Sequence, residues 1–167
     1  MTICQTITLD LDQELKNTRK LLERVPLDDA HRDYKPHAKS MALNRLATHV
    51  AELPSWIKTA IETDVLEMQP GFKPQIASNT MELLEIFDKN ARDSRAAIDK
   101  ATDDAMPKEW TFKFAGKTVF SSPRGQMIRN CIDHMIHHRA QLGVYLRLND
   151  VAIPGMYGPS ADDPSMF

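Results

Sequence analysis

Apolar residues recur at intervals of three and four along four long stretches of this sequence, and that period limits the chain to a mostly helical fold. The stretches cover residues 8–24, 40–63, 79–106 and 123–149. Each carries an apolar stripe opposite a polar face, as an amphipathic helix does. Four such helices can bury their stripes against one another, so the sequence predicts an all-α four-helix bundle.

Local signals suggest where the first two helices begin and end. Asp10, with Gln13 three residues later, has the spacing of a capping box for the first helix, and Pro26 follows its end. Ser40 is a favourable N-cap for the second helix. Pro54 falls inside the second apolar pattern and lacks a backbone N–H, which predicts a kink or a break there.

The last two helices carry start signals of the same kind. Asn79 and Glu82 form a second capping-box spacing, which we expect to start the third helix. Ser122 followed by Pro123 is typical of an N-cap followed by the first helical residue, and predicts the start of the fourth helix.

The remaining segments interrupt the helical period. Residues 27–39 read as an irregular connection, and residues 64–77 as a turn-rich crossover. Residues 109–120 alternate apolar and polar side chains around a glycine, which predicts a short β-hairpin before the last helix. The tail, residues 150–167, is rich in proline and glycine and cannot continue the fourth helix.

Composition indicates one soluble domain spanning residues 1–167, because 42% of its residues are hydrophobic and 26% are charged. The net charge of −2 gives no electrostatic case for nucleic acid or an anionic membrane. No apolar run spans a bilayer, and no signal peptide is recognisable, so we expect a cytoplasmic protein. The two cysteines, Cys4 and Cys131, are not expected to form a disulfide.

Three of the six histidines lie in the fourth predicted helix. His134 and His138 are four residues apart, which places both side chains on one face, where two imidazoles can reach one metal ion. His137 points away from that pair by about 100°. The pair lies on the apolar side of the helix, so ordinary core histidines are an alternative that this spacing alone leaves open.

A third histidine lies on a comparable face of the second predicted helix. His49 is flanked by apolar residues one turn away on either side, and it could meet His134 and His138 if the two helices are neighbours. Three imidazoles around one ion would leave a coordination position open, as catalytic zinc sites do. His31 and His37 lie in polar surroundings and are expected at the surface.

Two motifs resemble those of the DinB-like (YfiT-like) metal-binding four-helix-bundle family. Residues 134–142, His-Met-Ile-His-His-Arg-Ala-Gln-Leu, resemble the family's fourth-helix motif, and residues 46–52, Leu-Ala-Thr-His-Val-Ala-Glu, its second-helix motif. The hairpin at 110–120 and the tail at 151–159 are also similar. The resemblance implies a divalent metal held by His49, His134 and His138, and a homodimer.

The resemblance also implies a class of reaction. Characterised relatives use the metal to activate a low-molecular-weight thiol toward a small-molecule electrophile, so we expect a metal-dependent thiol S-transferase. A metal-dependent hydrolase and a non-catalytic, stress-related bundle with a structural metal are the alternatives. Zinc or nickel suits three histidines best, and iron is possible.

Five further residues on the same helical faces are candidates for the surroundings of the metal. Asn130 and Gln141 are placed one turn from a histidine, where they could hydrogen-bond to the ligands. Tyr145 and Trp56 are candidates for lining a pocket beside the site, and Cys131 for a soft ligand or redox-sensitive neighbour, although plain core roles are the more common ones for such residues.

Overall fold

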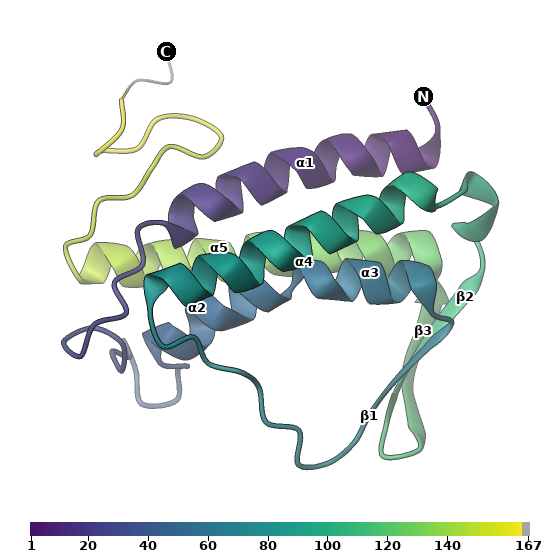
Figure 1. Cartoon of the computed structure of the whole chain (residues 1–167), viewed down its shortest axis with the longest axis horizontal. Coiled ribbons are helices and arrows are strands. Elements are labelled where there is room, and N and C mark those ends of the chain that lie inside the picture. Colours follow the sequence, from purple (N-terminus) through teal and green to yellow (C-terminus); the bar gives the residue numbers. More distant parts are fainter. Residues whose placement is uncertain (165–167) are drawn as a thin grey trace.

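The computed structural model describes residues 1–164 and confirms the mostly helical bundle with a small sheet before the last helix (Figure 1). The last three residues of the predicted tail lie outside the described residues. Along the described chain the helices and strands are α1 (Ile3–Leu22), α2 (Leu43–Glu52), α3 (Pro54–Glu62), β1 (Val65–Met68), α4 (Thr80–Lys100), a 3₁₀ turn (Asp103–Ala105), β2 (Glu109–Phe114), β3 (Lys117–Pro123) and α5 (Arg124–Leu148).

The second predicted helix is two helices, because Pro54 breaks it as expected. α2 ends at Glu52, and Pro54 is the first residue of α3, a position where its missing N–H costs nothing. α2 and α3 remain roughly in line and together form one rod of the bundle (Figure 1). The break therefore leaves four helical rods in the described chain.

Two predicted helix starts are wrong, because residues other than the predicted caps supply the partners of the first helical N–H groups. α1 begins at Ile3, since Thr2 and Gln5 form a reciprocal capping box, and Asp10 instead forms an ion pair with Arg129 on α5. α2 begins at Leu43 rather than after Ser40. Its first N–H groups donate to carbonyl oxygens of residues 32 and 34 in the preceding loop, so no side-chain cap is used.

The other two predicted starts are partly right. Asn79 caps α4 by accepting the N–H of Glu82, but the Glu82 carboxylate accepts the N–H and hydroxyl of Ser78 instead of the N–H of Asn79. Ser122 does not cap α5. It lies in β3 opposite Trp110, and α5 begins at Arg124, one residue beyond Pro123.

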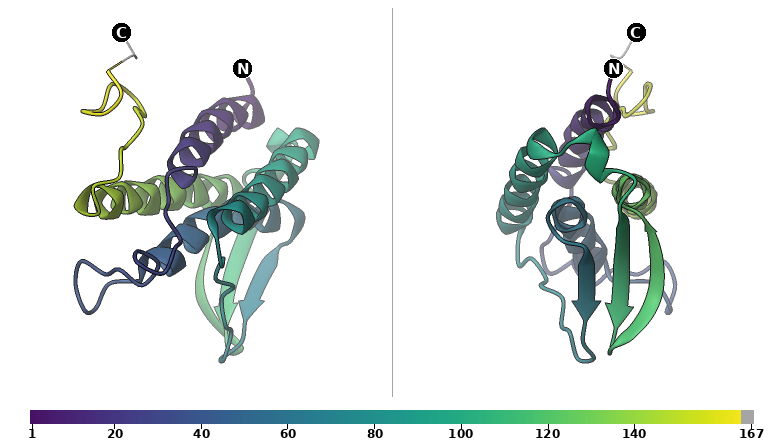
Figure 2. Two further views of the ribbon diagram at one scale, coloured as in Figure 1. Left: turned by 60° about the vertical axis from the view of Figure 1, so that its left-hand side comes forward. Right: turned by 90° about the vertical axis from the view of Figure 1, so that its right-hand side faces the viewer.

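The predicted hairpin is present as β2 and β3, and its turn contains Ala115 and Gly116. Both residues have positive φ, as two-residue hairpin turns with the right twist require. The segment 64–77, predicted as a turn-rich crossover, also contains a strand. Val65–Met68 forms β1 and pairs in parallel with β2, giving the order β1-β2-β3. The sheet extends from the end of the bundle where α3 ends and α5 begins (Figure 2).

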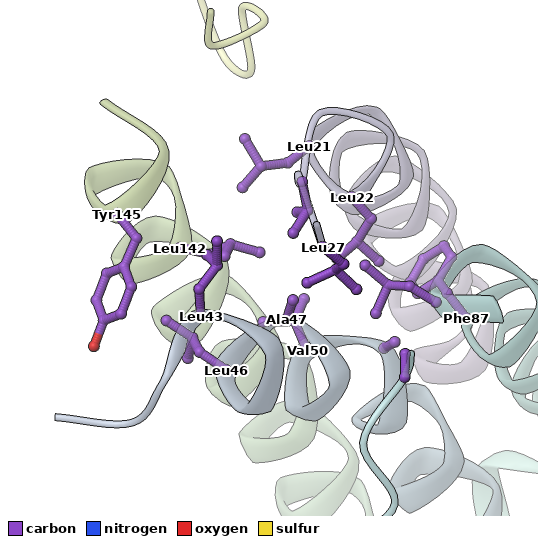
Figure 3. Packing of buried hydrophobic residues seen from close by; sticks show 14 of the residues in the cluster. Leu21, Leu22, Leu27, Leu43, Leu46, Ala47, Val50, Phe87, Leu142 and Tyr145 are labelled. Atoms are coloured by element: carbon purple, nitrogen blue, oxygen red, sulfur yellow. The ribbon is translucent and has the colours of Figure 1, made fainter. Parts of the chain in front are cut away.

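Buried apolar side chains from α1, α2, α4 and α5 pack into one core cluster (Figure 3). The centre of this cluster includes Leu22 from α1, Val50 from α2, Phe87 from α4 and Leu142 from α5, each almost fully buried. Burial of this kind stabilises by about 25 cal/mol for each square ångström of apolar surface. α2 and α5 are in contact over the middle of the bundle, which decides where the histidines lie.

No helix among residues 1–164 is both long and apolar enough to cross a bilayer.

Candidate metal centre

The fold brings His49 on α2 together with His134 and His138 on α5. The ring centroid of His49 lies 5.3 Å from that of His134 and 4.7 Å from that of His138, and the two α5 rings are also 4.7 Å apart. One nitrogen from each ring can be chosen so that all three nitrogens lie within 4.8 Å of one another. Shifts of roughly 1 Å would bring them to the 2.0–2.1 Å distance of a common zinc ion.

Helix geometry and helix contact place the three side chains. His134 and His138 share a face of α5 because they are separated by one turn. His49 lies in the last turn of α2, where its carbonyl accepts the N–H of Leu53 just before Pro54. The cluster lies at the rim of the bundle, since His49 and His138 are half-buried and His134 is exposed. One side of the group is therefore open to solvent.

Two of the three rings have a polar neighbour at Nδ1. His138 Nδ1 lies 2.8 Å from Gln141 Oε1, and Gln141 Nε2 lies 3.1 Å from a ring nitrogen of His137. His49 Nδ1 lies 3.8 Å from a carboxylate oxygen of Glu52. An acceptor at Nδ1 favours the tautomer with a proton there, which leaves the Nε2 lone pair for a metal.

The surroundings favour uncharged imidazoles. Partial desolvation, and then the neighbouring His138 and His49 rings, lower the pKa of His134 to about 4. Burial also lowers the pKa of His138, against a smaller raising effect of the Gln141 hydrogen bond. Metal binding requires deprotonated ligands, so this pair is ready to bind at neutral pH. The donor set and its protonation state fit a divalent ion.

The other candidates from the sequence are placed less directly. Asn130 is exposed, and its side chain makes no hydrogen bond to any part of the chain that the structure describes. Cys131 is buried in an apolar cluster, and burial raises the pKa of its thiol to about 12, which disfavours a thiolate ligand. Tyr145 donates its hydroxyl to the Met41 carbonyl oxygen, as a satisfied core tyrosine does.

Trp56 lines a cavity of about 530 Å³ between α3, β1 and the loop that follows β1. None of the three clustered histidines lines this cavity. His31 and His37, expected at the surface, lie in the loop before α2, where His31 contacts Asp28 and His37 accepts the N–H of Lys39.

Glu52 and Arg45 were not among the candidates from the sequence. Arg45 lies one turn before His49, and its guanidinium reaches a Glu52 carboxylate oxygen at 3.1 Å. The signal for Glu52 was its spacing, three residues after His49 on the same helix, which places the two side chains side by side.

The bundle, its small sheet and its three-histidine cluster define a class of helical proteins with a potential metal site between the second and last rods. The sequence matches the model of the DinB family over residues 5–165, so the chain belongs to the DinB family.

Solved structures of DinB-like proteins share this fold. One from Bacillus cereus ATCC 10987 superposes with a TM-score of 0.72 at 18% identity, covering 92% of this chain and 97% of that one. The DinB-like protein YjoA from Bacillus subtilis superposes with a TM-score of 0.68 at 17% identity, covering 90% and 96%. At these identities the likeness concerns the fold alone.

A curated relative matches over part of its length. Uncharacterized protein YrdA from Bacillus subtilis (strain 168) is 29% identical over 82 residues, which is 45% of this chain. The match spans 47% of the length of that relative.

Proposed function

We propose that His49, His134 and His138 bind one divalent metal ion and that this centre activates a low-molecular-weight thiol for transfer to a small electrophile. The observation that carries the proposal is the meeting of three imidazoles from two helices, with ligand atoms within 4.8 Å and one side open. A bound divalent ion would supply a Lewis acid that lowers the pKa of a coordinated thiol or water.

The residues around the centre would hold and orient its ligands. Gln141, bonded at His138 Nδ1, would fix that ring and leave Nε2 to bind the ion. The exposure of His134 keeps one approach open, so a small molecule can reach the ion from solvent. A closed structural zinc site would instead surround the ion with four protein ligands.

The chain's own thiols are poor nucleophiles, which supports an external thiol. Burial raises the pKa of Cys131 to about 12, and burial together with the nearby Asp103 raises that of Cys4 to about 11. Both therefore stay protonated at neutral pH, and the thiolate is the reactive form. A free thiol bound at the open side would supply the attacking sulfur.

A hydrolase that uses the same centre to activate water is the second candidate, because the same open position is accessible to water. A cytoplasmic homodimer remains part of the proposal.

The first experiment is elemental analysis of protein purified without a histidine tag, beside His134→Ala and a His37→Ala control. We expect about one divalent ion per chain in the wild type and in His37→Ala, and none in His134→Ala, because two ligands hold an ion far less tightly than three. A wild type that binds neither zinc nor nickel after reloading would overturn the proposal.

The second experiment separates the two reactions. The metal-loaded protein is incubated with an electrophile, with and without added thiols, and the products are analysed by mass spectrometry. A thiol adduct that forms only with the metal-loaded wild type supports the transferase. A hydrolysed product that forms without any thiol supports the hydrolase and contradicts the thiol assignment.

A further inference from the structure

At the end of α2, the Glu52 carboxylate lies beside both the Arg45 guanidinium and the His49 ring. One of its oxygens is 3.1 Å from the Arg45 guanidinium and 3.8 Å from His49 Nδ1. All three side chains are largely shielded, with exposed fractions of 23% for Arg45, 22% for Glu52 and 14% for His49. The electrostatic effect of a carboxylate on its neighbours is screened less by water at such a position than in open solvent.

The position of Glu52 matters because a histidine can bind a metal through only one of its two nitrogens at a time. A carboxylate beside Nδ1 favours the proton on Nδ1 and so directs the Nε2 lone pair toward the metal. The 3.8 Å separation exceeds hydrogen-bond length, and a small rotation of either side chain would close it.

Arg45 fixes the position of the Glu52 carboxylate. The two residues are seven apart on α2, two turns along one face, and their hydrogen bond holds the carboxylate beside His49.

We propose that Glu52, anchored by Arg45, is the positioning residue that sets His49 as an Nε2 metal ligand. This inference rests on the proposed metal centre. It gives His49 the same kind of support that Gln141 gives His138, but with a charged acceptor. The His134 ring makes no hydrogen bond with the described residues, so polar support of this kind is found only at His49 and His138.

The test compares zinc dissociation constants, measured by competition with a chromogenic chelator, for the wild type, Glu52→Ala, Glu52→Gln and Glu62→Gln. Glu62 is an exposed residue at the end of α3 and serves as the matched control. We expect zinc binding to weaken by about 10- to 100-fold in Glu52→Ala and by less in Glu52→Gln, whose amide oxygen can still accept a hydrogen bond. Arg45→Met, which removes only the anchor, should fall between wild type and Glu52→Ala.

A second readout reports the tautomer directly. In ¹⁵N-labelled, zinc-loaded wild type, the His49 ring should show a protonated Nδ1 and a metal-bound Nε2, and the Nδ1 proton should lose its hydrogen-bonded shift in Glu52→Ala. A merely structural role for Glu52 would leave this signature unchanged. Far-ultraviolet circular dichroism of the metal-free variants checks that each is folded, and Glu52→Gln preserves shape if Glu52→Ala does not fold.

The outcomes distinguish the two levels of the proposal. If the wild type binds zinc and Glu52→Ala and Glu52→Gln bind it within twofold of the wild type, the positioning role is wrong and the metal centre stands. If His49 binds through Nδ1, the positioning role is also wrong. If the wild type binds neither zinc nor nickel, the centre itself is wrong and the role of Glu52 falls with it.

Discussion

Two polar clusters on α5 differ in how completely their groups are paired. On one face, Arg139 is 4% exposed and forms an ion pair at 2.6 Å with Glu14 of α1, a residue that also accepts the Tyr157 hydroxyl. On another face, His134 and His138 meet His49 with one side open to solvent. The first cluster satisfies its charges within the protein, and the second leaves nitrogen lone pairs unused.

This difference separates stability from function in one helix. A buried charge must be paired, so the Arg139 cluster holds α1, α5 and the tail together and offers little to a ligand. Uncharged imidazoles can stay unpaired at a rim at lower cost, and they remain available to an ion. We therefore expect substitutions in the two clusters to affect different measurements.

The largest effect is expected from Arg139→Met, which leaves Glu14 buried without its partner. The free energy of unfolding should fall by about 3–5 kcal/mol, because an uncompensated buried carboxylate is strongly destabilising. Urea unfolding of the metal-free protein measures this loss. Zinc affinity should stay within a few-fold of wild type, since Arg139 does not contact the histidines.

A milder change in the same cluster provides the comparison. Tyr157→Phe removes one hydroxyl and should cost about 1 kcal/mol, the usual net value of a hydrogen bond. If Arg139→Met were as stable as Tyr157→Phe, the view that Glu14 needs a buried charged partner would be wrong.

The second effect concerns the histidine cluster, where zinc binding should raise the free energy of unfolding. Zinc at about 100 times its dissociation constant should raise the free energy of unfolding by about 2.7 kcal/mol, because only the folded state gathers the three ligands. Thermal unfolding with and without zinc measures the gain. His138→Ala should abolish the gain and change the metal-free stability little, and a wild type that zinc leaves unchanged would remove the distinction between the clusters.

The smallest effect is a pH dependence of the metal-free protein. Folding lowers the pKa of His134 to about 4 from an ordinary value of 6.5, because of burial and the neighbouring imidazoles. The unfolded chain therefore binds more protons in that interval, and stability is lost as pH falls from about 6.5 toward 4. Chemical unfolding at pH 7, 6 and 5 should show a shallower decline for His134→Ala, and equal slopes would contradict the prediction.

Much of the fold was predictable because its causes are local. The helical periods place apolar stripes on one face, Pro54 cannot continue a hydrogen-bonded turn, and Gly116 accepts the positive φ of a hairpin turn. The N-caps predicted at Asp10, Ser40 and Ser122 were wrong because capping competes with partners from other segments.

The site was predictable in part for the same reason. The spacing of His134 and His138 alone placed them on one face, and Gln141 one turn further reaches a histidine nitrogen. Trp56 illustrates the limit, since helical position gave its face but not the cavity that it lines. Glu52 was overlooked because a carboxylate three residues after a histidine is common on solvated helices.

The sequence by itself determined the helices, the hairpin and the pairing of two histidines on α5, because hydrogen bonds and side-chain periods within one segment set them. Only the tertiary structure decided that α2 lies against α5, that Val65–Met68 joins the sheet, and that Arg139 faces Glu14. These features depend on which surfaces meet, and contacts between residues far apart in the chain follow from burying the whole apolar surface at once.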